Sequence, residues 1–271
     1  MMSTPRSRLP TLYIPHGGGP CFFMEVPPAF PPDLWDRMAA YLRGIDASLG
    51  LRPKAVLVIS AHWETPVPTV NASAHPPLLY DYYGFPEHTY RLAYAAPGSP
   101  ALAARVRELL TEAGIESAKE AHRGLDHGVF VPFKLIYPGA DVPIVQLSLQ
   151  EGLDPGTHLE IGRVLAPLRD EGVLIVGSGM SYHNLRELFN GSDSRLAEDF
   201  HAWLAQAVSD AAGRKGELTS WREAPGALAC HPRSEHLLPL MVAAGAAEGD
   251  RGIRTYHDRL MGKAVSGFQF G

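Results

Sequence analysis

Five of the twelve histidines in this chain lie in motifs rich in glycine or proline, or beside an acidic residue. The motifs are PHGGGP around His16, SAHWE around His62, GLDHG around His127, GSGMSYHNL around His183 and CHPRSEHLLPL around His236. Neutral imidazole is a common metal ligand and a common general acid or base. No single motif is specific, but a hydrophobic core does not need five such histidines. The set predicts a metal centre with catalytic histidines beside it.

Each motif alone also has a purely structural interpretation. His16 could lie in a turn, His62 could end a strand, and His127 could belong to an ordinary Asp-His turn. Asp126 beside His127 is the kind of neighbour that fixes an imidazole tautomer, although adjacency in sequence does not ensure a hydrogen bond. Residues 177–179 (GSG) form a glycine-rich turn after an apolar run. They lack the spacing of a phosphate loop or a nucleophile elbow.

The last motif combines two histidines with an acid. Ser234 is expected to cap a helix that begins near Glu235 and has His236 in its first turn. His231 and His236, with Glu235 between them, resemble part of a metal site, but the order is not that of the His-Glu-x-x-His metalloprotease helix. Neighbours on a helix point about 100° apart, so Glu235 and His236 are not expected to reach one ion together.

The other histidines lack such surroundings, and most of them are expected on the surface: His75, His88, His122, His158, His201 and His257. Two of them, His75 and His88, flank the aromatic segment at 79–86. This segment could line a pocket for an aromatic ring, although loop packing is the commoner role of such clusters.

Apolar runs alternate with amphipathic segments along the chain. Strands are predicted at 11–15, 55–60, 143–149 and 173–176, and helices at 33–49, 101–113, 158–169, 194–212 and 235–247. Ser99 and Pro100 are suited to begin the second helix, and Gly114 is suited to end it. This alternation indicates one three-layer α/β/α domain over 1–271 with a mixed central sheet, preceded by a flexible segment at 1–9. Because sites of open α/β sheets gather at the carboxyl ends of strands, His16, His62 and the turn before His183 could converge.

Composition excludes several classes of partner. The formal net charge is −5, 45% of residues are hydrophobic, and acidic residues interrupt the arginine-rich stretch at 251–259. We therefore expect neither nucleic-acid binding nor a membrane-spanning helix. Two cysteines, Cys21 and Cys230, give no disulfide framework, and no apolar signal segment follows the first arginines. The expectation is a cytoplasmic protein, and the sequence leaves its oligomeric state open.

The motifs resemble those of class III extradiol ring-cleavage dioxygenases of the 4,5-DOPA dioxygenase type, in the superfamily of the protocatechuate 4,5-dioxygenase catalytic subunit. The chain carries them in the family's order, over nearly its whole length. They are PHGGGP at 15–20, SAHW at 60–63, YGFP at 83–86, AAPGSP at 95–100, GLDHG at 124–128, GSG-x-x-x-HNL at 177–185 and P-x-x-EH-x-x-PL at 232–240.

The resemblance implies an extradiol dioxygenase that uses O2 to open a catechol-type aromatic ring. Its metal ligands would be His16, His62 and His236. His183 would orient the substrate and transfer protons, and His127 would act in acid-base catalysis or oxygen activation, although these two roles could be exchanged. Residues expected behind them or at the substrate are Asp126, Tyr182, His231 and Glu235.

The sequence leaves more than one possibility open for the metal and for the activity. Wider relatives often use two histidines and one carboxylate, which suits Fe(II), whereas three histidines also suit Zn(II). One divalent ion, Fe(II) or Zn(II), is therefore expected. A zinc hydrolase and a non-catalytic metal-binding relative are the two competing interpretations. The sequence does not identify the catechol or the cleavage position.

Overall fold

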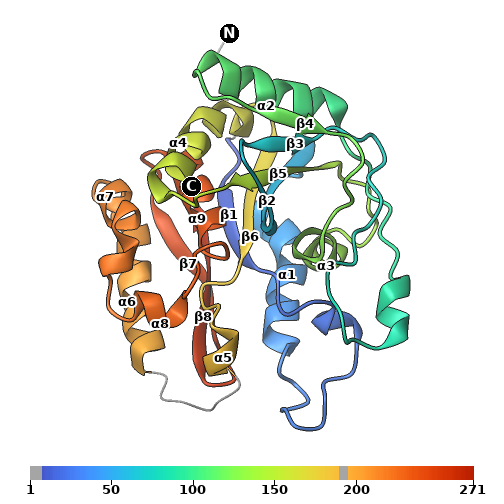
Figure 1. Ribbon diagram of the computed structural model, residues 1–271, viewed down its shortest axis with the longest axis vertical. Helices are drawn as coiled ribbons and strands as arrows, with labels where there is room; N and C mark the ends of the chain where they lie inside the picture. The colour runs from blue at the N-terminus through green and yellow to red at the C-terminus, as the bar shows by residue number, and fades with distance from the viewer. Residues whose placement is uncertain (1–7, 189–194) are drawn as a thin grey trace.

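A mixed sheet with the strand order β4-β3-β5-β2-β6-β1-β8-β7 forms the centre of the protein (Figure 1). The computed structural model describes residues 8–188 and 195–271. Within them the strands are β1 (Thr11–Pro15), β2 (Ala55–Thr65), β3 (Thr69–Asn71), β4 (Ala118–Glu120), β5 (Ile144–Gln150), β6 (Val173–Gly179), β7 (Gly252–Leu260) and β8 (Lys263–Phe270). The four central strands, β5, β2, β6 and β1, run parallel, and β8 pairs antiparallel with both β1 and β7.

Helices cover both faces of the sheet. They are α1 (Asp36–Leu49), α2 (Pro100–Glu112), α3 (His127–Ile136), α4 (Pro155–Leu165), α5 (Leu185–Leu188), α6 (Arg195–Ser209), α7 (Arg214–Thr219), α8 (Ala227–Cys230) and α9 (Leu238–Ala247). Short 3₁₀ turns lie at Cys21–Phe23, Glu87–Arg91, Ala166–Arg169 and Trp221–Glu223. Figure 1 shows α1 and α3 on one face and α4, α6 and α9 on the other. The predicted three-layer α/β/α fold with a mixed sheet is confirmed.

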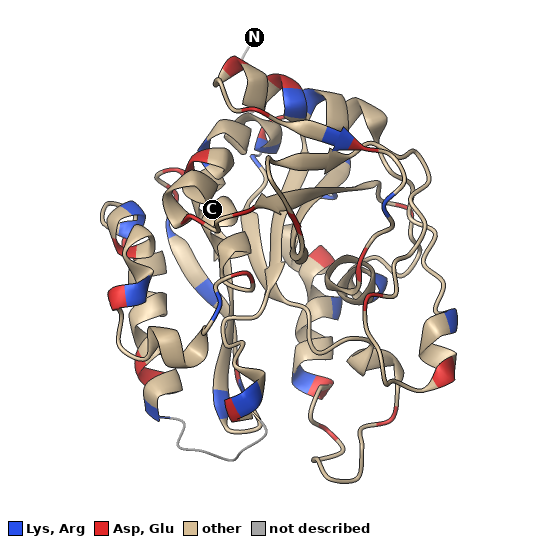
Figure 2. Ribbon diagram, viewed as in Figure 1, with Lys and Arg blue, Asp and Glu red and all other residues tan. Residues whose placement is uncertain are grey.

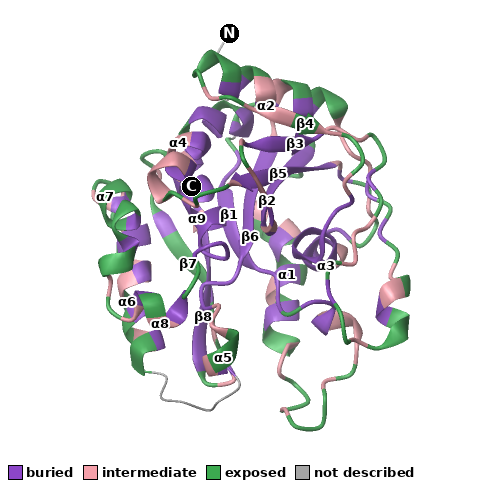
Figure 3. Ribbon diagram, viewed as in Figure 1, coloured by how far each residue is buried: buried purple, intermediate pink, exposed green. Residues whose placement is uncertain are grey.

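Strands β2, β5 and β6 are buried along most of their length because helices cover both of their faces (Figure 3). Helix α9 is apolar around its whole circumference and packs on β1 and β6 and against α4. Two glycines bring these helices together. A Cβ at Gly162 of α4 would lie 2.1 Å from the carbonyl oxygen of Val242, and a Cβ at Gly245 of α9 would lie 2.0 Å from that of Leu159.

The helix that was predicted at 101–113 has the expected ends. The Ser99 side chain accepts a hydrogen bond from the backbone N–H of Leu102, Pro100 is in the first turn, and Gly114 adopts a positive φ of 74°. Of the segment predicted to be flexible, residues 1–7 lie outside the described part of the chain. Leu9 is buried, and its N–H donates to the carbonyl oxygen of Arg169 at 3.3 Å. The helix predicted from residue 194, which is not described, is seen from Arg195.

Most of the six histidines outside the motifs were expected on the surface, and four of them are exposed, whereas His158 and His201 are buried. The Nδ1–H of His201 donates to the carbonyl oxygen of Ala197 at 2.7 Å. Its Nε2 lies 2.8 Å from Oγ of Ser181, and that oxygen accepts the N–H of Ser266. The ring is therefore held as a neutral tautomer with both nitrogens bonded.

Charged side chains of both signs are distributed over the outer helices and loops, whereas the central strands carry almost none (Figure 2). In the described residues, no helix combines the length and apolarity that crossing a bilayer would require.

Candidate active site

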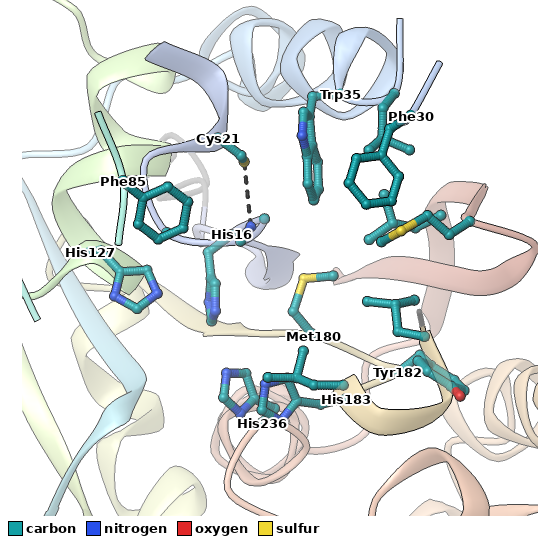
Figure 4. Close-up of a pocket in the computed structure, with 18 of the residues that line it drawn as sticks. His16, Cys21, Phe30, Trp35, Phe85, His127, Met180, Tyr182, His183 and His236 are labelled. Carbon is teal, nitrogen blue, oxygen red and sulfur yellow. Dashed lines mark hydrogen bonds between the residues drawn. The ribbon is translucent and has the colours of Figure 1, made fainter. Parts of the chain in front are cut away.

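The histidines of the five motifs line one cavity, and Figure 4 shows four of them, His16, His127, His183 and His236, around it. His16 follows β1 directly. The next strand was predicted to end at residue 60, but β2 continues to Thr65, so His62 lies within it. The pairing of β2 with β5 shifts between Ile59 and Glu64. Such irregularities redirect side chains, and here His62 reaches the ring of His16.

Strand β6 lies between β2 and β1, and the GSG motif is its last part. The prediction of a turn at 177–179 was therefore wrong. A Cβ at Gly177 would lie 2.3 Å from the carbonyl oxygen of Pro239, and one at Gly179 would lie 2.2 Å from that of His236. The glycines are needed because the segment that carries His236 packs directly against this strand.

Three imidazoles face one another at this point. The ring centroids of His16 and His62 are 4.9 Å apart, those of His16 and His236 are 5.2 Å apart, and those of His62 and His236 are 4.9 Å apart. The Nε2 atoms of His16 and His62 are separated by 3.2 Å. All three side chains line one cavity of about 390 Å³, together with His127 and His183.

A serine on the middle strand fixes the tautomer of His16. The Ser178 hydroxyl donates to the carbonyl oxygen of Gly128. Its oxygen therefore accepts the Nδ1–H of His16, at 3.1 Å. The lone pair of His16 is consequently on Nε2, the atom that faces His62.

Glu235 fixes the tautomer of His236, as Ser178 does for His16. The predicted helix start was wrong, because α9 begins at Leu238 and the Ser234 hydroxyl caps nothing. Glu235 and His236 lie in the turn before the helix, where the 100° separation does not apply. Oε1 of Glu235 is 2.9 Å from Nδ1 of His236 and 3.1 Å from Nδ1 of His183. This one oxygen holds both rings, which stack with centroids 3.3 Å apart.

His127 is oriented by Asp81, not by its neighbour in sequence. Oδ1 of Asp81 accepts the Nδ1–H of His127 at 2.8 Å and its backbone N–H at 2.9 Å. Asp126 is fully buried on the other side, where it accepts hydrogen bonds from Ser60 at 2.7 Å and from Gln146. The Asp126 side chain therefore does not orient His127, although the two residues are adjacent in sequence. Asp126 is instead the N-cap residue of α3, and its backbone carbonyl oxygen accepts the N–H groups of Val129 and Phe130.

Two other residues that were predicted for the site, Tyr182 and His231, lie at different distances from the cavity. Tyr182 lines the cavity. His231 is buried behind it, and its Nε2 donates to the carbonyl oxygen of Ser181 at 2.8 Å. It packs against the rings of Phe200 and Trp221. His231 therefore supports the backbone beneath Tyr182 and does not face the cavity.

Burial determines the charge state of the three facing imidazoles. Desolvation, reinforced by the neighbouring histidines, lowers the pKa of His16 and His62 well below the ordinary value. Desolvation also lowers the pKa of His236 to about 3, against the opposing hydrogen bond to Glu235. Burial raises the pKa of Glu235, but its hydrogen bonds to His183 and His236 outweigh this and lower it. At neutral pH the imidazoles are neutral and the carboxylate is charged, as metal binding requires.

Two kinds of site residue were missed in the sequence. Ser178 and Asp81 hold imidazoles, and they come from segments far along the chain from the histidines that they orient. The aromatic segment at 79–86 did give a signal: it contributes Asp81 and places Phe85 on the cavity wall. The other wall residues, such as Trp35 and Phe30, lie in ordinary amphipathic or proline-rich sequence, which carries no functional signal.

Comparisons with known proteins agree with this arrangement. Residues 10–268 match the family described as the catalytic LigB subunit of aromatic ring-opening dioxygenase. Dioxygenase tasH of Hapsidospora irregularis is 37% identical over an alignment of 286 positions, which covers 99% of this chain and 87% of that protein. The 4,5-DOPA dioxygenase extradiol of Beta vulgaris is 43% identical over 219 residues, covering 79% of this chain and 81% of that protein.

A solved structure shows the same fold. The crystal structure of an uncharacterized protein from Escherichia coli K12 superposes with a TM-score of 0.77 at 32% identity, covering 97% of this chain and 100% of that chain. A protein of the same organism named 4,5-DOPA dioxygenase extradiol is 40% identical over 206 residues, or 74% of this chain and 76% of that protein. The chain therefore belongs to the catalytic LigB subunit family of aromatic ring-opening dioxygenases, and it is an extradiol ring-cleaving enzyme.

Proposed function

We propose that this enzyme opens the ring of a catechol-type substrate with O2 at a single divalent ion held by His16, His62 and His236. The observation that carries the proposal is the near-equal spacing of these three rings. Both hydrogen-bonded members, His16 and His236, are fixed through Nδ1, which leaves Nε2 of each ring to bind an ion.

The spacing can be compared with what a shared ion requires. An Nε2–metal bond is about 2.1 Å, and the ring centroid lies roughly 1.1 Å beyond the nitrogen. Ligand angles of roughly 90–110° then separate the centroids by about 4.5–5.2 Å. The observed values of 4.9, 5.2 and 4.9 Å all fall in this interval. The 3.2 Å between the Nε2 atoms of His16 and His62 corresponds to a ligand angle of about 100°.

The other two histidines fit this geometry less well. Ligand atoms of His127 lie within 4.8 Å of those of His16 and His62, so His127 is the competing third ligand. Its ring centroid, however, is 4.0 Å from that of His62 and 5.6 Å from that of His16. His183 is stacked on His236 at 3.3 Å. Both rings are thus displaced from the positions that ligands of one ion would take, and they remain available for proton transfer.

When bound, a divalent ion would lower the pKa of the catechol hydroxyls, and Fe(II), unlike Zn(II), would also supply the electrons that O2 requires. We therefore propose Fe(II) as the working metal. This redox requirement, together with the dioxygenase relatives, disfavours the zinc hydrolase and the non-catalytic alternative.

We assign acid-base catalysis to His127 and substrate orientation to His183. Oδ1 of Asp81 accepts two N–H groups, both from His127, and Oδ2 of the same carboxylate lies 4.0 Å from Nδ1 of His62. With its Nδ1–H bonded to Asp81, His127 keeps Nε2 available to accept a proton. Oε1 of Glu235 accepts hydrogen bonds from both His183 and His236, and stacking on His236 restrains His183 further. We therefore assign proton transfer to His127, and we assign hydrogen bonding to a substrate hydroxyl to the more restrained His183.

Two variants test the assignment. The purified protein would be loaded anaerobically with Fe(II) or Zn(II) and assayed for metal content and for O2 uptake with several catechols. We expect O2 uptake with Fe(II) only. His236→Ala should lose most of its bound metal, whereas His127→Ala should keep the metal and lose turnover. The reverse pattern would make His127 the third ligand and overturn the proposal.

We also propose a cytoplasmic location. It is supported by the two cysteines, Cys21 and Cys230, which are both buried free thiols. Cell fractionation with an antibody against the protein tests it.

A further inference from the structure

The cavity has two chemically different sides. Histidines form one side, and apolar side chains form the rest. Figure 4 shows Phe30 and Trp35 across the cavity from His183 and His236. Three separate segments supply the apolar wall: the loop and helix start at 24–35, helix α5, and the turn between β7 and β8, which contributes Leu260 and Met261.

Among the described residues, no Lys, Arg, Asp or Glu side chain lines this cavity. Arg186 and Glu187 follow Leu185 in α5, but neither contributes to the wall. Glu235 lies behind the rings of His183 and His236 and is engaged by both. Among the described side chains that line the cavity, a charged group on a bound molecule would therefore find no ionic partner of opposite sign, and burying an unpaired charge is strongly unfavourable.

The cavity is also larger than a bare catechol. Its volume of about 390 Å³ equals that of about 13 liquid water molecules. A catechol whose diol faces the histidines fills well under half of this space. The remainder adjoins Phe30, Leu34 and Trp35, and the flexible thioethers of Met24 and Met261 can adapt to a substituent of irregular shape.

We propose that the substrate is a catechol with an uncharged, apolar substituent, and that this enzyme discriminates against catechols whose side chain carries a carboxylate or an ammonium group. The inference rests on the proposed ring-opening function and names its substrate class. The diol faces the histidines, and the substituent lies against the wall formed by Phe30, Leu34, Trp35 and α5.

Binding can be measured without turnover. The Zn(II)-loaded protein cannot transfer electrons to O2, so dissociation constants can be determined by calorimetry or by quenching of the tryptophan fluorescence, to which Trp35 in the cavity wall contributes. The probes are 4-propylcatechol, dihydroxyphenylpropionate and L-DOPA, which share the ring and the side-chain length and differ in charge. We expect 4-propylcatechol to bind at least tenfold more tightly than either charged ligand. Equal or tighter binding of L-DOPA would overturn the inference.

A charge placed on the wall should change this preference. Leu185 lines the cavity and is 54% exposed, so Leu185→Arg can be accommodated without disturbing the core. It should tighten binding of dihydroxyphenylpropionate at least fivefold and leave 4-propylcatechol equal or weaker. Leu196→Arg is the matched control, because Leu196 is equally exposed on α6 but lies outside the cavity. An equal gain in the control would refute the cavity as the cause.

The two proposals fail in different ways. If 4-propylcatechol binds best but the Fe(II)-loaded enzyme does not consume O2 with it, the ring-opening proposal fails and the binding preference stands. If the Fe(II)-loaded enzyme cleaves L-DOPA with a higher kcat/KM than 4-propylcatechol, ring opening stands and the substrate class is wrong.

Discussion

Replacing Glu235 with glutamine should weaken metal binding while leaving the fold intact. Oε1 of Glu235 is 2.9 Å from Nδ1 of His236 and 3.1 Å from Nδ1 of His183, and its ionised state makes both hydrogen bonds charge-assisted. The amide oxygen of glutamine occupies the same position and still accepts both N–H groups. Glu235→Gln therefore removes the negative charge and keeps both hydrogen bonds to the histidine rings.

The magnitude follows from the two kinds of hydrogen bond. A bond to a charged group contributes about 1.5–3 kcal/mol, and a neutral one contributes about 0.5–1.5 kcal/mol. Only the bond to His236 acts on a proposed ligand directly, so the loss is about 1–1.5 kcal/mol. This corresponds to roughly tenfold weaker binding. Glu235→Ala removes both acceptors and should cost about 100-fold, the upper end of the usual effect of residues that orient metal ligands.

Competition of the protein with a chromophoric zinc chelator at neutral pH measures the affinity. Glu64→Gln is the matched control. Arg233 pairs with both carboxylates, Glu64 at 2.5 Å and Glu235 at 3.4 Å, but Glu64 bonds to none of the cavity histidines. It should bind zinc as the wild type does. The reasoning would be refuted if Glu235→Gln kept full affinity, or if Glu64→Gln lost as much.

Three further predictions concern other parts of the site and the fold. Asp81→Asn should lower kcat at least tenfold with a much smaller loss of zinc affinity, because Oδ1 of Asp81 holds the ring of His127 at 2.8 Å, whereas its Oδ2 lies 4.0 Å from Nδ1 of the proposed ligand His62. Steady-state kinetics and the chelator assay separate the two effects. Gly179→Ala should reduce zinc affinity, because a Cβ there would lie 2.2 Å from the carbonyl oxygen of His236 and must displace the backbone of that residue. An unchanged affinity in the chelator assay would contradict this close contact between β6 and His236. Burial lowers the pKa of His201 to about 3, so below pH 6.5 the unfolded chain takes up a proton that the folded chain does not. Stability should therefore fall by about 2 kcal/mol from pH 7 to pH 5 on account of this residue, and urea denaturation of His201→Asn should show a shallower pH dependence.

The central strands were predictable because their apolar runs reflect burial on both faces. The end of β2 was not, because a shift in the register of β2 against β5 between Ile59 and Glu64 leaves no signal in hydrophobicity. The hairpin of β7 and β8 was missed for a different reason. Strand β7 lies at the edge of the sheet and exposes most of its residues, so the charged stretch at 251–259 lacks the apolar run that indicated the central strands.

In the site, the five histidines were found in the sequence, but the groups that orient them were largely not. Asp126 is adjacent to His127 in the chain, yet the backbone at the start of α3 turns its carboxylate away and leaves Asp81 to accept the ring N–H. Ser178 reaches His16 across 162 residues of sequence. Such pairings depend on sheet register and on loop paths, which local patterns do not specify.

The position of β1 between β6 and β8 has a consequence for biosynthesis. A nascent chain that has emerged only as far as the middle of the protein offers β1 neither neighbour, and His16 then has no Ser178 beside it. The ribosome must release more than two hundred residues before His236 can join the other two rings. The three rings proposed to hold the metal are therefore brought together only in an almost finished polypeptide.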